Sequence, residues 1–282
     1  FAEIEDEHGR GHAQTDLGLV LVRLGRFEAA RTTLEDARTA HQAAGDAFGE
    51  GKALVNLGNL YRAADDLDRA GAAYREAEDR FRESDDAASL AVTLGLLAQT
   101  ARGQGETEAA RRYADEELSV QREIDDPVGI GKALINLSGV QRDLGEGEAA
   151  EASVQEAIAL FTAAGDKRST GLALYNLAML QEGSGQFEAA LASYHQELAL
   201  LKEVDDRDGQ VVTLRSIAGV LGDLSRDDEA DEYLAASSAL AAELGDAYQL
   251  SISEGLIAER LHEQDQPEAA AERFARAIEH AR

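Results

Sequence analysis

The feature that most constrains this chain is a period of forty residues that runs through its whole length. One aspartate and one alanine recur every forty residues. The aspartates are Asp46, Asp86, Asp126, Asp166, Asp206 and Asp246, and the alanines are Ala30, Ala70, Ala110, Ala150, Ala190, Ala230 and Ala270. A chain of 282 residues would otherwise suggest two compact domains, but repetition at this length predicts a stack of similar helical units.

Seven units account for almost the entire chain and leave no insertion that could form a separate domain. Their approximate bounds are 5–44, 45–84, 85–124, 125–164, 165–204, 205–244 and 245–282. We therefore expect one solenoid domain over residues 1–282. Because the first residue is Phe1 and helical sequence begins almost at once, we also expect the chain to be a piece of a longer protein.

Each unit contains two helical patterns separated by a short break. In the second unit Leu54, Leu57 and Tyr61 recur at helical spacing, and Leu67 and Tyr74 do so after the break. A column of large apolar residues marks the buried side of every first helix. It reads Leu17, Leu57, Leu97, Leu137, Leu177, Ile217 and Ile257. No strand pattern competes, so the fold class is all-α.

The two recurring small and acidic residues have physical roles that the pattern predicts. The aspartate precedes each first helix, where its carboxylate can accept hydrogen bonds from unpaired backbone amides as an N-cap. The alanine lies in each second helix, where a small side chain lets the two helices of a unit approach closely.

Composition excludes several classes of function. The chain has 55 acidic and 27 basic residues and a formal charge of −28, which disfavours binding to nucleic acid and to anionic membrane surfaces. It has no cysteine, so disulfides, thiolate metal sites and cysteine nucleophiles are excluded. No apolar run approaches the roughly 20 residues that span a bilayer, and no export signal opens the chain, so we take a cytoplasmic location as the default.

The repeated residues resemble a known family. Asn56, Leu57, Gly58 and Tyr61, followed by Ala70, are similar to the consensus of the tetratricopeptide repeat. The forty-residue period resembles the long-repeat branch found in polarity adaptors with GoLoco motifs, kinesin light chains, Rap regulators and the sensor arms of STAND-type ATPases. The resemblance implies a right-handed superhelical solenoid of seven helix–turn–helix repeats. It also implies a concave groove that binds a peptide, and no catalysis.

The resemblance places the ligand on the side of each first helix that faces away from the apolar column. At about 100° per residue, polar side chains gather on that side. The predicted peptide-binding residues are Lys52, Asn56, Asn59, Arg62, Gln99, Arg102, Lys132, Asn136, Arg142, Asn176 and Arg215. Arginine forks suit carboxylates and side-chain amides suit a peptide backbone, so we expect a partner segment with acidic character.

Two simpler interpretations stay open for these residues. The arginines could pair with acids one helical turn away and serve only solubility. The asparagines could make polar contacts between repeats. In the last three units the same face becomes acidic, with Glu182, Asp223, Glu259 and Glu263 against Arg215.

Catalytic and metal sites are not indicated by the sequence. His8 and His12 lie four residues apart and could share a helix face as metal ligands do, but such a site needs a third ligand and a nearby acid. The six histidines do not recur at a common position in the repeat, so we expect most of them at the surface. We predict no catalytic residue, no cofactor and no bound metal.

The sequence therefore favours a non-enzymatic scaffold that binds a peptide segment of a protein partner. One alternative is the sensor arm of a larger STAND-type signalling ATPase or transcription regulator, which would take a small ligand or effector. Another is self-association through the exposed ends of the repeat stack. Neither nucleic acid nor a membrane is an expected partner.

Overall fold

A computed structural model describes residues 6–281 and is entirely helical over that range, with no strand among those residues. The helices are α1 (Glu7–Arg23), α2 (Phe27–Ala44), α3 (Ala47–Ala63), α4 (Leu67–Glu83), α5 (Ala87–Gly103), α6 (Thr107–Glu123), α7 (Pro127–Asp143), α8 (Gly147–Ala163), α9 (Lys167–Gly183), α10 (Phe187–Glu203), α11 (Arg207–Asp223), α12 (Asp227–Leu244), α13 (Ala247–Glu263) and α14 (Pro267–His280). The predicted all-α solenoid of helix–turn–helix repeats is confirmed.

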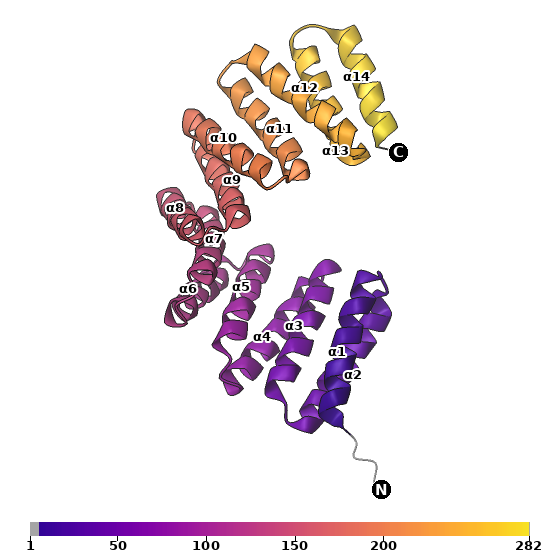
Figure 1. Ribbon diagram of the computed structural model, residues 1–282, viewed down its shortest axis with the longest axis vertical. Coiled ribbons are helices and arrows are strands. Elements are labelled where there is room, and N and C mark those ends of the chain that lie inside the picture. The colour runs from indigo at the N-terminus through magenta and orange to yellow at the C-terminus, as the bar shows by residue number, and fades with distance from the viewer. Residues whose placement is uncertain (1–5, 282) are drawn as a thin grey trace. The chain divides into compact units, whose positions relative to one another are not determined.

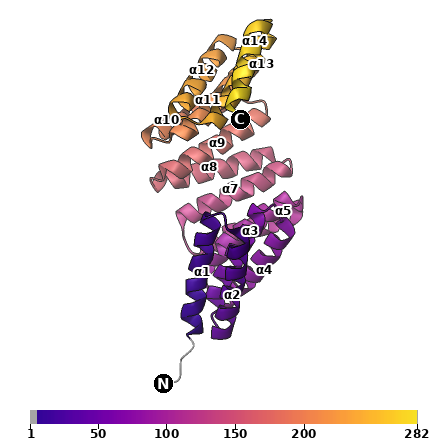
Figure 2. The same cartoon turned by 90° about the vertical axis from the view of Figure 1, so that its right-hand side faces the viewer.

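The chain divides into two compact units, the first ending at Glu146 and the second beginning at Gly147. The first unit contains α1 to α7 and the second contains α8 to α14. Within each unit a helix packs against its neighbours along the chain, as Figures 1 and 2 show for α1 to α5 and for α11 to α14. In the first unit, α1 also contacts α3 and α5 contacts α7, so first helices of successive repeats lie beside one another.

Small residues allow the close contact between the helices of a repeat. Ala30, Ala70 and Ala110 in the first unit are completely buried, and so are Ala150, Ala190 and Ala230 in the second. In the second repeat the ring of Tyr74 packs directly on Gly58, where an added Cβ atom would lie 2.4 Å from Tyr74 Cε1. The predicted role of the small residues as packing positions is confirmed.

The turns between helices use a left-handed backbone position at a fixed place in the repeat. Glycine fills this position at Gly45 and Gly165, and aspartate fills it at Asp85, Asp125 and Asp205 with φ between 53° and 57°. Glycine adopts this conformation without steric cost, and aspartate is among the few other residues that tolerate it.

The recurring aspartate caps each first helix as predicted. Asp86 Oδ1 accepts a hydrogen bond from the Ser89 amide at 2.7 Å, and Asp246 Oδ1 accepts one from the Gln249 amide at 3.0 Å. Side-chain caps of this kind are also present at Asp6, Asp46, Asp126, Asp166 and Asp206. Part of the strong negative charge of the chain therefore has a structural role.

One member of the apolar column, Leu17, is exposed, and Ile257 is only partly buried. Leu57 lies between Leu34 of α2 and Ala73 of α4, and only 4% of its surface is exposed. Leu17 occupies the same place in the first repeat but is 50% exposed. Leu57 is covered by α2 of the preceding repeat, whereas no helix among the described residues precedes α1 and covers Leu17. The prediction that the whole column is buried is wrong at this position. None of the described helices is long and apolar enough to cross a membrane.

The cap gives a first prediction for stability. Replacing Asp86 with alanine leaves the Ser89 amide without its partner, so we expect the free energy of unfolding to fall by about 1 kcal/mol. Urea unfolding followed by circular dichroism measures this change. Asp86→Asn keeps an oxygen acceptor and should lose much less, and equal losses in the two variants would contradict the assignment.

Candidate functional site

A hollow of about 370 Å³ lies in the first unit, across the first helices of the first three repeats. We call the side of the unit formed by α1, α3, α5 and α7 the first-helix face. The hollow is lined by Leu19 of α1, Lys52, Val55 and Asn56 of α3, Phe81 at the end of α4, and Ala88, Ser89, Val92 and Thr93 of α5. Two of the predicted groove residues, Lys52 and Asn56, therefore lie together in one concave place.

Two lysines provide positive charge on this face that no acid in the described part of the chain neutralises. Lys52 and Lys132 are both exposed, and neither forms an ion pair with any residue in the described range 6–281. The Lys52 ammonium lies 5.4 Å from the centre of the Phe48 ring, which holds it near the hollow. A carboxylate brought to Lys52 would not have to displace an existing acidic partner.

Asn59 and Arg62 lie next to the buried hydroxyl of Tyr74. The Tyr74 hydroxyl donates a hydrogen bond to Asn59 Oδ1 at 2.8 Å. Burial raises the pKa of Tyr74, while its hydrogen bond with Arg62 acts in the opposite direction. The side-chain oxygen of Asn59 therefore stabilises the repeat itself, whereas Arg62 stays exposed at the end of α3.

Gln99 and Asn136 belong to a polar network that joins the third and fourth repeats. Gln99 Nε2 donates to Asn136 Oδ1 at 3.1 Å, and Asn136 Nδ2 donates to the two Glu117 carboxylate oxygens at 3.2 and 3.0 Å. The Glu117 carboxylate fits there because Gly95 has no side chain; an added Cβ would lie 2.7 Å from Glu117 Oε1. Both ends of the Asn136 amide are thus engaged within the protein.

Two of the predicted arginines share one acid. Arg102 lies over Gly139 of α7, and its Nε donates to Asp143 Oδ2 at 2.7 Å. Arg142 Nη2 lies 3.5 Å from the other oxygen of the same carboxylate. The hydrogen bond from Arg102 lowers the pKa of Asp143, which keeps the acid ionised. Arg102 therefore links α5 to α7, and Arg142 is the more exposed of the two.

The remaining two predicted residues belong to the second unit. Asn176 Nδ2 donates to the Leu172 carbonyl of its own helix at 3.0 Å. Arg215 Nη1 donates to Gln249 Oε1 at 2.6 Å, which joins α11 to α13, and burial lowers the pKa of this guanidinium. The eleven predicted residues are therefore distributed over both units and do not form one described site.

Sequence reasoning missed the apolar part of the hollow. Val92 is 57% exposed and occupies the position in the third repeat that Lys52 and Lys132 hold in the second and fourth. Leu19 is 40% exposed on α1. The sequence shows an apolar residue between two lysines in one column of the repeat. That pattern alone does not predict a binding site, because only the fold brings Leu19 and Val55 to the same hollow as Val92.

Comparisons with known proteins agree with the repeated architecture. Models of the tetratricopeptide repeat match residues 11–36, 49–123 and 129–203, which together are more than half of the chain. No curated protein matches the chain by sequence.

Solved structures share the fold at low sequence identity. The apo form of RapI superposes with a TM-score of 0.70 at 15% identity, over 96% of this chain and 97% of that one. A Rap protein complexed with competence and sporulation factor gives a TM-score of 0.64 at 17% identity, over 96% and 75%. A STAND signal-transduction ATPase with a tetratricopeptide repeat sensor from Pyrococcus horikoshii gives 0.78 at 15%, over 96% of this chain and 42% of that one.

The buried Glu117 gives a prediction for the dependence of stability on pH. Burial raises its pKa from 4.5 to about 7, although the Asn136 hydrogen bond opposes the shift. Below pH 4.5 the Glu117 carboxyl is protonated in both the folded and the unfolded chain, so folding does not have to bury a charge and the stability contributed by the neutral carboxyl is fully present. As the pH rises from 4.5 through about 7, the unfolded chain releases this proton more readily than the folded chain. The free energy of unfolding should therefore fall by about 3 kcal/mol in total.

Urea unfolding at pH 5 and pH 8 measures this loss. Glu117→Gln stays neutral at both values and should remove the contribution of this site to the pH dependence. Glu108→Gln, a change at an exposed position of the same helix, is the matched control and should leave the dependence as it is. Identical pH dependence in Glu117→Gln and in the unchanged chain would show that Glu117 is not the group responsible.

Proposed function

The chain belongs to the tetratricopeptide repeat family, and we propose that it is a non-catalytic scaffold that binds an extended segment of a partner protein on the first-helix face of its first unit. The proposed docking point is the hollow between α1, α3 and α5. Lys52 and Asn56 are the contacts kept from the sequence prediction, and Leu19, Val55 and Val92 are added to them.

The observation that supports this proposal most strongly is the combination of apolar walls and an unpaired cation in one hollow. Leu19 and Val92 keep much of their surface in contact with water in the chain described, so covering them with an apolar side chain is favourable. Asn56 carries both a donor and an acceptor, and no hydrogen bond within residues 6–281 engages its side chain. It can therefore pair with the backbone of a bound segment.

The charges suggest the character of the segment. Lys52 and Lys132 are unpaired cations on the first-helix face of a chain whose formal charge is −28. An acidic side chain near either ammonium gains local attraction, although the net negative charge of the rest of the molecule repels acidic groups elsewhere, so these two lysines are the places where an acidic residue can dock. We therefore propose a segment with a large apolar residue close to an aspartate or glutamate.

Related folds provide precedents for two uses of such a surface. A Rap protein has been solved in complex with competence and sporulation factor, and the STAND protein has a repeat domain described as a sensor. Both precedents concern other proteins at 17% identity or less. The local residues favour a peptide segment here, because the hollow extends across three repeats and five of its nine lining residues are apolar.

Peptide display against the full chain tests the proposal. We expect enriched peptides to combine an apolar anchor with an acidic residue and to bind less tightly as salt increases. Val92→Asp places a charge on the apolar wall, and Lys52→Glu reverses the charge beside it. Each should weaken a selected peptide by about tenfold or more, which corresponds to about 1.4 kcal/mol.

Lys202→Glu is the matched control, because it makes the same charge change at an exposed lysine in the second unit. It should leave the affinity within about a factor of two of the starting value, since only long-range screened interactions change. Selection of basic peptides, or full affinity retained by both Val92→Asp and Lys52→Glu, would contradict the proposed site.

A further inference from the structure

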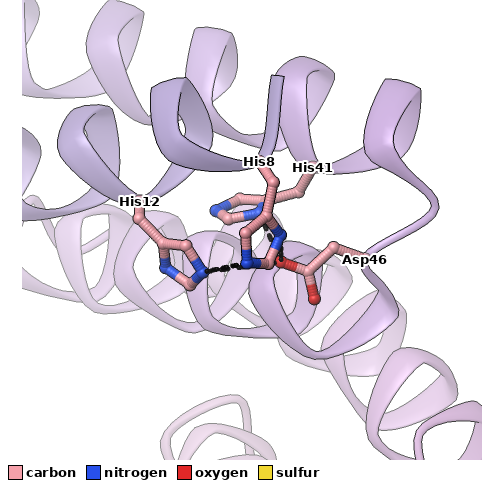
Figure 3. A group of neighbouring side chains, drawn as sticks. All are labelled: His8, His12, His41 and Asp46. Carbon is pink, nitrogen blue, oxygen red and sulfur yellow. Dashed lines mark hydrogen bonds and ion pairs between the residues drawn. The ribbon is translucent and has the colours of Figure 1, made fainter. Parts of the chain in front are cut away.

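Three of the six histidines in the chain meet at one place in the first unit, together with an aspartate. His8 and His12 lie one turn apart on α1, His41 lies in the last turn of α2, and Asp46 is the N-cap of α3 (Figure 3). Each residue offers one nitrogen or oxygen atom, and these four atoms lie within 4.8 Å of one another. The third ligand and the acid that sequence spacing could not place are His41 and Asp46.

Asp46 Oδ2 is the centre of the cluster. It lies 2.8 Å from His41 Nδ1, 3.1 Å from His8 Nδ1 and 3.8 Å from His12 Nε2. The Nε2 atoms of His8 and His12 are 3.1 Å apart. Two ligands that each lie about 2.0–2.1 Å from a tetrahedral zinc ion are about 3.3 Å from one another. The separations from Asp46 Oδ2 lie within about 0.5 Å of that value. Because His8 uses a different nitrogen toward His12, the four ligand atoms taken one per residue lie within 4.8 Å of one another, and side-chain rotations would have to close the shell around an ion.

His41 is held in the orientation that a metal ligand needs. Its ring is completely buried, whereas the other five histidines are exposed or partly exposed, in line with the expectation that most histidines lie at the surface. While Nδ1 faces Asp46, Nε2 lies 3.3 Å from Thr15 Oγ1, and the Thr15 hydroxyl donates to the Gly11 carbonyl at 3.0 Å. In this structure Nδ1 donates to Asp46 Oδ2; with an ion bound, the proton would move to Nε2 and face Thr15 Oγ1, which would leave Nδ1 free as the ligand.

The surroundings of His41 are specific to this repeat. The same position holds Phe81 in the second repeat and Phe161 in the fourth, where the aromatic ring is part of the core. Two glycines make space for the imidazole. A Cβ atom at Gly49 would lie 2.2 Å from His41 Nδ1, and one at Gly11 would lie 2.8 Å from His41 Cε1.

Capping of α3 does not explain the histidines. Asp46 Oδ1 accepts the hydrogen bond from the Gly49 amide at 2.9 Å, and the equivalent Asp86 and Asp246 cap their helices with no histidine at the corresponding positions. The cap uses one carboxylate oxygen and leaves Oδ2 directed at the three imidazoles. This division gives the two oxygens of one side chain separate roles.

We propose that His8, His12, His41 and Asp46 bind a single divalent transition-metal ion of the zinc type. Imidazole nitrogens select zinc, cobalt, nickel and copper over calcium and magnesium, which prefer oxygen ligands. Four protein ligands complete a tetrahedral shell, so the ion has a structural role. It ties the first turns of α1 to the α2–α3 connection and so fixes the first repeat against the second.

The competing explanation is a hydrogen-bonded cluster that needs no metal. In that arrangement His8 bridges Asp46 and His12, using one ring nitrogen for each at 3.1 Å. Such a cluster predicts no selective binding of cobalt or zinc, so a metal titration separates the two explanations.

The experiment is a titration of the full chain, first stripped of metal with a chelator, with Co²⁺ and then Zn²⁺. We expect one Co²⁺ ion per chain with the intense visible absorption of tetrahedral coordination, and its displacement by Zn²⁺. An excess of Ca²⁺ or Mg²⁺ should displace neither ion. Zn²⁺ should also raise the midpoint of thermal unfolding.

Variants at the exposed ligands keep the test independent of folding. His8 is exposed and His12 is partly exposed, so His8→Gln and His12→Gln remove a ligand without disturbing the core. Each should abolish the tetrahedral Co²⁺ spectrum and the thermal shift. Thr15→Val keeps all four ligands but removes the hydrogen bond to His41, and it should weaken Zn²⁺ binding by about 10- to 100-fold.

His262→Gln changes an exposed histidine in the second unit and should leave metal binding unchanged. The proposal is overturned if Co²⁺ gives no tetrahedral spectrum, or if His12→Gln binds Zn²⁺ as tightly as the unchanged chain. Equal displacement of Zn²⁺ by Ca²⁺ would also overturn it, because that result would indicate binding to surface carboxylates.

Discussion

Close contact between the two helices of each repeat is the constraint on which the rest of the structure depends. That contact requires a side chain no larger than alanine at one position of every second helix, and the alanines at this position in the first six repeats are completely buried. In the second repeat Gly58, which lies opposite Tyr74, also allows the two helices to approach closely. Once the helix pairs pack in this way, stacking successive pairs buries the apolar columns and presents successive first helices side by side.

Function in such a stack depends on the residues that break the repetition. The columns of alanine, leucine and capping aspartate perform the same task in each repeat, so they carry little information about a ligand. Lys52 lies in a column that is apolar in four of the seven repeats, Val92 among them, and His41 lies where the second and fourth repeats have phenylalanine. The two proposed sites are built around these exceptions, one on the first-helix face and the other at the first connection between repeats.

The sequence was sufficient to predict the helices, their pairing and the aspartate caps, because these follow from patterns that recur every forty residues. It could not predict how polar side chains pair across repeats. Asn136 was predicted as a groove residue from its position, but Gln99 and Glu117 engage its amide because Gly95 leaves room for the carboxylate. His8 and His12 lacked partners in the sequence, since His41 and Asp46 approach them only when α1 packs on α2 and the next connection.

The most direct test of this account compares two identical substitutions in α4, the second helix of the second repeat. Ala70 is completely buried against the neighbouring helices, whereas Ala72, two residues further along, is exposed. The free energy of unfolding in urea, with amide hydrogen exchange over α3 and α4, should be measured for Ala70→Leu and Ala72→Leu. We expect a loss of about 1–3 kcal/mol and faster exchange for Ala70→Leu, and a change within about 0.5 kcal/mol for Ala72→Leu. Equal stability of the two variants would contradict the central role given to the close helix contact.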